Sequence, residues 1–66
     1  MTFSKLLEKK LQEKGMSKAE LARIIDVADT TVGRYVKGTM TPRPLILNRI
    51  AKALDCSSEE LYKYFS

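Results

Sequence analysis

The chain has 66 residues, 44% of them hydrophobic, and its 12 basic and 8 acidic side chains give a net charge of +4. This length predicts a single domain over residues 1–66, and the hydrophobic fraction is too high for a disordered chain. One cysteine and no histidine argue against a disulfide or a zinc cluster, and neither a membrane span nor a secretory signal is present. We therefore expect a cytoplasmic protein without a cofactor or a membrane partner.

Five segments show helical periodicity, and none shows the sustained alternation of a β-strand. The first helix is predicted from about Ser4 to Lys14, and it ends at Gly15, which readily adopts the left-handed conformation of a C-cap. Its apolar face holds Phe3, Leu6, Leu7 and Leu11.

The second helix begins with a capping box, in which the side chains of Ser17 and Glu20 each accept the backbone N–H of the other. It is predicted to end near Asp26. The residues at core spacing are Leu21, Ala22, Ile24 and Ile25.

The third helix is predicted from about Ala28 to Lys37, before Gly38. Its propensity is poor, because three consecutive residues are β-branched and Gly33 costs about 1 kcal/mol relative to alanine in a helix interior. Tertiary packing must therefore hold it, through the inward-facing residues Val32, Tyr35 and Val36.

The fourth helix is predicted to begin around Pro42–Pro44, since proline is accepted in a first helical turn but not later. Its buried stripe is Leu47, Ile50, Ala51 and Leu54. The fifth begins with a second capping box, from Ser57 to Glu60, and its apolar face is Leu61, Tyr64 and Phe65. Five short helices predict a compact all-α domain.

The second and third helices and the tight turn between them predict a helix-turn-helix over residues 17–38. Two helices that cross steeply over a short turn must approach closely, and the small side chain of Ala22 permits this. Val27 and Val32 are placed to fill the angle between the helices.

This stretch resembles the Cro/repressor-type helix-turn-helix family of phage repressors and small bacterial regulators, and the resemblance covers about residues 3–65. The residues that carry it are Gly15-Met16-Ser17, Glu20-Leu21-Ala22, Val27, Thr31-Val32, Gly38, Pro42, Ala51-Lys52-Ala53-Leu54 and Ser57 to Leu61. It implies a five-helix domain of the lambda-repressor-like type, whose third helix enters the DNA major groove by its N-terminal part.

The resemblance implies base contacts from Asp29, Thr30, Thr31 and Arg34. Helical spacing agrees, because an inward Val32–Tyr35–Val36 face turns most of these residues and Gly33 outward. Arg34 can donate two parallel hydrogen bonds to guanine O6 and N7. Asp29 either accepts from a cytosine amino group or serves as an N-cap or first-turn carboxylate. Gly33 either lets the helix approach the groove or is simply tolerated.

Phosphate contacts are expected on both sides of this helix. Backbone N–H groups around Ser17 and Lys18 form an anion site at a helix start, although the family commonly has glutamine in place of Lys18 to brace the reading helix. Residues 30–54 hold five basic and no acidic side chains, which favours a polyanion partner. The further candidates, each of which could instead be an ordinary solvated loop residue, are Lys37, Thr39, Thr41 and Arg43.

Three positions depart from the family pattern. Leu11 and Val36 replace an arginine–glutamate pair, which is the outcome expected when a buried ion pair is exchanged as a unit. Ala28 stands where serine or threonine usually caps the third helix, a role that Asp29 could take over. Cys56 occupies an apolar core position and is expected to be a buried, inert thiol rather than a redox sensor.

Leu45 points away from the buried stripe of the fourth helix, while Ile46 and Tyr62 flank buried faces. These residues predict an isologous homodimer through the fourth and fifth helices, unless Leu45 only covers a helix start.

The favoured function is a regulator that binds double-stranded DNA at a palindromic operator. A protein antagonist or an inducer is a further candidate partner. The alternative is an antitoxin or adaptor module. An enzyme is not expected, since no nucleophile–base pair or Gly-rich phosphate loop is present.

Overall fold

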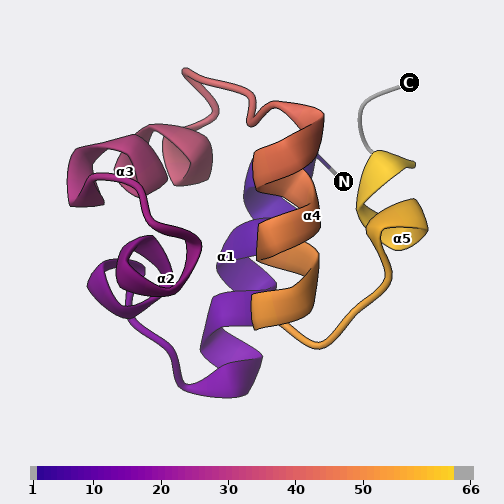
Figure 1. The fold of residues 1–66 in the computed structure, drawn as a ribbon, viewed down its shortest axis with the longest axis horizontal. Coiled ribbons are helices and arrows are strands. Elements are labelled where there is room, and N and C mark those ends of the chain that lie inside the picture. Colours follow the sequence, from indigo (N-terminus) through magenta and orange to yellow (C-terminus); the bar gives the residue numbers. More distant parts are fainter. Residues whose placement is uncertain (1, 64–66) are drawn as a thin grey trace.

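The computed structural model describes residues 2–63 and has five helices within them (Figure 1). They are α1 (Phe3–Lys14), α2 (Lys18–Ile25), α3 (Asp29–Lys37), α4 (Pro44–Ala53) and α5 (Ser58–Tyr62). In Figure 1, α4 lies between the α2–α3 pair and α5. The predicted all-α class, the helix-turn-helix and the five-helix architecture are confirmed. None of the helices in the described part of the chain is both long and apolar enough to cross a membrane.

All five helices contribute side chains to one hydrophobic core. Helix α3 packs against α1 and α2, while α4 packs against α2 and α5. The largest fully buried side chains are Leu7, Leu21, Ile25, Val32, Leu47, Ile50, Leu54 and Leu61. The apolar faces predicted for the first and fourth helices are confirmed. Of the face predicted for the fifth helix, Leu61 is buried, whereas Tyr64 and Phe65 lie outside the described residues.

One predicted core residue is wrong. Ile24 is 57% exposed, whereas Leu21, Ala22 and Ile25 on the same helix are completely buried. With 100° between successive residues, these three buried positions define one face of α2, and Ile24 falls about 100° from its centre. Val36 of α3 was also expected to face inward, and it is only partly buried against the core.

The helix ends largely follow their local sequence signals. Ser17 Oγ accepts from the Glu20 N–H at 3.1 Å, and the Ser17 N–H donates to Glu20 Oε1 at 3.4 Å, which confirms the first capping box. Gly15 and Gly38 end α1 and α3 at φ values of 63° and 82°, in the left-handed region that glycine tolerates best. Thr2, which is not among the predicted caps, caps α1 by accepting from the Lys5 N–H at 3.3 Å.

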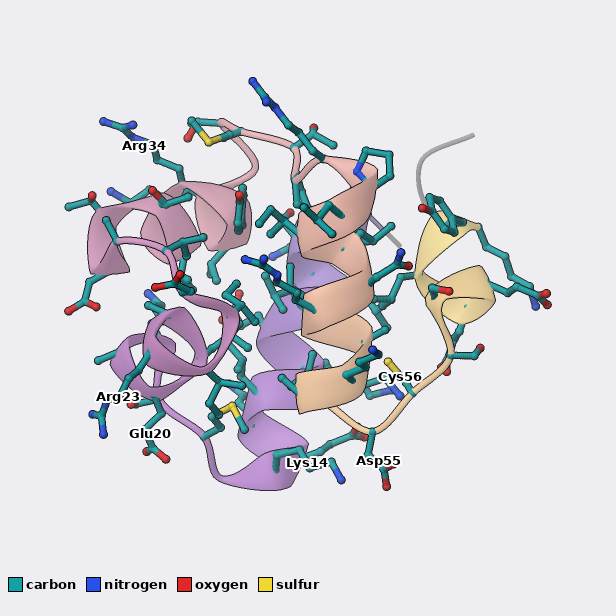
Figure 2. The ribbon with its side chains drawn as sticks, in the orientation of Figure 1. Lys14, Glu20, Arg23, Arg34, Asp55 and Cys56 are labelled. Atoms are coloured by element: carbon teal, nitrogen blue, oxygen red, sulfur yellow. The ribbon has the colours of Figure 1, made fainter. Side chains whose placement is uncertain are left out.

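Only one of the two hydrogen bonds predicted for the second capping box is present. Ser57 Oγ accepts from the Glu60 N–H at 3.2 Å, but the Glu60 carboxylate forms an ion pair with Lys10 Nζ of α1, also at 3.2 Å. The hydrogen bond that the Lys10 ammonium donates to the Glu60 carboxylate, together with the negative charge of Glu60, raises the pKa of Lys10. A weaker pair joins Lys14 to Asp55 at 3.9 Å (Figure 2). The acidic C-terminal segment is therefore tied to the basic side of α1.

Cys56 lies in the connection between α4 and α5 (Figure 2). It is only partly buried against the core, so the prediction of a buried thiol is wrong on this point. Burial nevertheless raises the pKa of the thiol, and the nearby Glu60 carboxylate adds to the effect. A raised pKa lowers the thiolate fraction at neutral pH, and it is the thiolate that reacts.

The start of α3 offers a direct test of the missing cap. Ala28 is the N-cap, with extended dihedral angles of −71° and 149°, and it provides no side-chain hydrogen bond. We predict that Ala28→Ser will raise the free energy of unfolding by about 1 kcal/mol, because a hydroxyl there can accept a free N–H of the first turn. Chemical denaturation measures this. Ser17→Ala, which removes a cap that is present, should lower the free energy of unfolding by about the same amount; no gain for Ala28→Ser would contradict the argument.

Candidate nucleic-acid interface

The turn between α2 and α3 is held by backbone hydrogen bonds and by a close helix crossing. Asp26 adopts the left-handed conformation at φ 61°, and the N–H groups of Asp26 and Val27 both donate to the Ala22 carbonyl. Ala22 and Val32 are completely buried, and Val27 packs partly buried against the core. These positions agree with the close approach that the small Ala22 side chain was expected to permit.

The outer face of α3 carries the residues predicted to read bases. Asp29, Thr30 and Arg34 are exposed, and Thr31 is partly exposed. On the opposite face, Val32 is completely buried and Tyr35 nearly so. Figure 2 shows the Arg34 side chain extending from α3 away from the rest of the molecule. The apolar residues of α3 therefore anchor its inner face, and its outer face exposes polar side chains. The base contacts themselves stay predictions.

Asp29 does not cap α3. It is the first residue of the helix, after the N-cap Ala28, and the helix has no side-chain capping bond. The prediction that Asp29 replaces the missing cap is therefore wrong. Its carboxylate still lies in the first turn, where the positive end of the helix dipole favours a negative charge.

Gly33 lies between Thr30 and Arg34 on this helix. A Cβ atom built on Gly33 would meet nothing within 4 Å, and the residue does not have a positive φ. Neither packing within the protein nor the backbone conformation therefore requires glycine here. A reason for glycine at this position, if there is one, has to come from something outside the chain.

The expected anion site at the start of α2 is partly occupied by the protein itself. Ser17 and Lys18 are both exposed, but the N–H groups of Ser17 and Glu20 are used by the capping box. Since the first N–H groups of a helix have no partner within it, those of Lys18 and Ala19 are the ones left for an anion. The Glu20 carboxylate beside them opposes an anion, whereas the Lys18 ammonium favours it.

The last residue of α3 and the loop after it carry the second set of predicted phosphate contacts, and all of them are exposed: Lys37, Thr39, Thr41 and Arg43. Thr39 has a structural role as well, because both its N–H, at 3.0 Å, and its hydroxyl, at 3.3 Å, donate to the Arg34 carbonyl. The N-terminal end of α1 lies beside this loop. A hollow of about 390 Å³ there is lined by Thr2, Phe3, Ser4, Tyr35, Lys37, Gly38, Met40 and Thr41.

One basic residue of the 30–54 stretch has a partner in the protein. Nη1 of Arg49, on α4, donates a hydrogen bond to the Ile25 carbonyl oxygen at 3.2 Å. From the sequence, Arg49 is expected only to belong to the basic stretch that favours a polyanion partner. No local signal could have identified this contact, because the two residues are far apart in the sequence.

Leu11 and Val36 lie together, as expected of residues that replace an ion pair. Both line a hollow of about 480 Å³ where the end of α1 meets the start of α2. Leu11 is buried and Val36 is partly buried. Within residues 2–63, no three His, Cys, Asp or Glu side chains are grouped to hold a metal ion.

The residues proposed for a dimer surface differ in exposure. Leu45 is 63% exposed and Tyr62 is 40% exposed, whereas Ile46 packs partly buried against the core. Tyr62 also lines a hollow with Pro42, Pro44 and Leu47, which places α5 beside the start of α4. Leu45 and Tyr62 can thus contribute accessible apolar surface, and Ile46 contributes less.

Comparison with known proteins gives one match. A family model described as helix-turn-helix covers residues 7–61, which includes α2, α3 and α4 in full. No curated protein and no solved structure matches the chain.

Proposed function

Because the chain belongs to the Cro/C1-type helix-turn-helix family of DNA-binding regulators, we propose that it binds a palindromic operator as a homodimer and regulates transcription. The observation that carries this proposal is α3, which exposes Asp29, Thr30 and Arg34 while Val32 and Tyr35 anchor its other face. By covering the operator, the dimer blocks or recruits the polymerase.

The base contacts of this proposal come from the N-terminal and middle parts of α3. Arg34 donates two hydrogen bonds to a guanine, which is the most specific contact that the helix offers. Thr30, with Thr31 beside it, presents a methyl group to thymine or a hydroxyl to a base or phosphate. Asp29 accepts from a cytosine amino group, since its carboxylate has no capping role.

The phosphate contacts lie on both sides of α3. At the start of α2, the backbone N–H groups of Lys18 and Ala19 and the Lys18 ammonium bind one phosphate. From the end of α3 onward, the Lys37, Thr41 and Arg43 side chains follow the next stretch of the DNA backbone. Ser17 and Thr39 act mainly by bracing these two sites, because their hydroxyl groups already have partners in the protein.

A homodimer would double the contact surface and align two reading helices. We assign the interface to Leu45 of α4 and Tyr62 of α5, with Ile46 at its edge, since Leu45 and Tyr62 are large apolar side chains that the fold leaves exposed. Two-fold symmetry would place the half-sites about 34 Å apart, one turn of the DNA helix.

Selection of bound fragments from a pool of random double-stranded DNA tests the proposal. The expected result is a palindromic consensus, and sedimentation should show a dimer at high micromolar concentration. A consensus without two-fold symmetry, or a monomer with and without the selected DNA, would remove the dimer. Failure to enrich any sequence would remove the sequence-specific regulator and favour a module that binds a protein partner.

Substitution of Arg34 separates base reading from charge. We predict that Arg34→Ala will weaken binding to the selected operator by about 1–3 kcal/mol, with relaxed preference at one base pair, because a bidentate contact is lost. Lys37→Ala removes the same charge three residues later and should weaken operator and random DNA alike. Titrations at several salt concentrations measure both effects. An equal loss on both kinds of DNA for Arg34→Ala would contradict its role in base reading.

Gly33→Ala is predicted to move stability and DNA binding in opposite directions. The free energy of unfolding should rise by about 1 kcal/mol, because alanine is the better helix former and its methyl group meets no protein atom. Affinity for the operator should fall by about tenfold, the size of one unfavourable base pair, if the helix backbone approaches the groove at this residue. Greater stability with unchanged affinity would show that glycine is merely tolerated.

A further inference from the structure

A side-chain hydrogen bond connects α4 with the end of α2. Arg49 is exposed overall, yet its Nη1 lies 3.2 Å from the Ile25 carbonyl oxygen, in a partly buried contact. This bond spans 24 positions of the sequence, whereas the side-chain bonds of the caps and turns described above join residues at most five apart. We refer to it as the Arg49–Ile25 link.

The Arg49–Ile25 link acts at a point where the backbone needs a partner. Ile25 is the last residue of α2, and the last carbonyl groups of a helix have no N–H partner within it. The positive guanidinium also meets the negative end of the helix dipole. Since the Ile25 side chain is completely buried, the link fixes a helix end whose other side is already packed in the core.

The link lies directly before the turn that aims α3. The next residue, Asp26, adopts a left-handed conformation that residues other than glycine rarely take, so neighbouring contacts must hold it there. Helix α3 contributes little to its own start, because Ala28 supplies no side-chain cap. The direction of the first turn of α3 therefore depends on how firmly the end of α2 is held.

We propose that Arg49 is a positioning residue for DNA reading. By joining the end of α2 to α4, it fixes the turn at residues 26–28 and thereby the part of α3 that carries Asp29 and Thr30. The same helix, α4, begins next to Arg43, so the link also relates the reading helix to the phosphate contacts of the loop. This inference rests on the proposed function. The position of Arg49 in the basic 30–54 stretch would instead suggest that it neutralises a phosphate.

The matched control is Lys52, an exposed basic residue three positions later on α4. Arg49→Met and Lys52→Met each remove one positive charge, but only Arg49→Met removes the link. Arg49→Lys keeps the charge on a shorter, single-point donor and is the milder variant if Arg49→Met lowers stability strongly. All three are compared with the wild-type full chain at a temperature where each is folded.

The first measurement is amide hydrogen exchange of the free protein, which does not depend on DNA. We expect Arg49→Met to speed exchange several-fold at Val27, Thr31 and Val32, whose N–H groups donate within the turn and the first turn of α3. Lys52→Met should leave these amides unchanged, and Arg49→Lys should fall between wild type and Arg49→Met. Equal exchange in the two methionine variants would overturn the inference, even if the protein bound no DNA.

The second measurement is the ratio of affinities for the selected operator and for random double-stranded DNA. Arg49→Met should lower this ratio by about tenfold, the size of one lost base contact, and leave the salt dependence of binding as in wild type. A loss of equal size on both DNAs, with a salt slope smaller by about one, would make Arg49 a phosphate contact and overturn the inference. Faster exchange with an unchanged ratio would also overturn it, because the link would then only stabilise the fold. If wild type selects no operator, the proposed function fails and the exchange result alone decides whether the link positions α3.

Discussion

The packing of α3 through Val32 and Tyr35 is the interaction on which the rest of the structure depends. This helix has β-branched residues in its first half, a glycine in its middle and no side-chain N-cap, so its own propensity is low. Burial of one face against α1 and α2 supplies what propensity does not. Because the inner face anchors the helix in the core, the outer face is free to carry polar groups.

Two of the features that weaken α3 are not required by packing within the protein. A Cβ atom at Gly33 would meet no protein atom within 4 Å. Ala28, which is exposed, provides no hydroxyl group for the N–H groups of the first turn. The neighbouring helices are better secured, α1 by Thr2 and Gly15 and α2 by its capping box. The domain thus combines a stable frame with one helix of low intrinsic propensity, a local conflict of the kind expected at functional sites.

The tertiary structure divides the basic residues between two tasks. Lys10 and Lys14 of α1 pair with Glu60 and Asp55, so the acidic C-terminal segment is occupied far from the outer face of α3. Arg49 joins α4 to the end of α2. Around α3 and its following loop remain three cations that form no ion pair within residues 2–63: Arg34, Lys37 and Arg43. This distribution suits a polyanion better than the net charge alone indicates.

The sequence by itself determined the five helices, most of their ends and most of the core, because capping boxes, C-terminal glycines and apolar stripes act over three or four residues. The match of Ser17 with Glu20 and the buried stripe of α4 are of this kind. Only the tertiary structure decided that Ile24 faces solvent, that Glu60 pairs with Lys10 and that Arg49 reaches Ile25. Each of these depends on which helix lies opposite. Glu60 and Arg49 each have more than one chemically suitable partner, and the packing of the helices determines which of these partners lies within hydrogen-bonding distance.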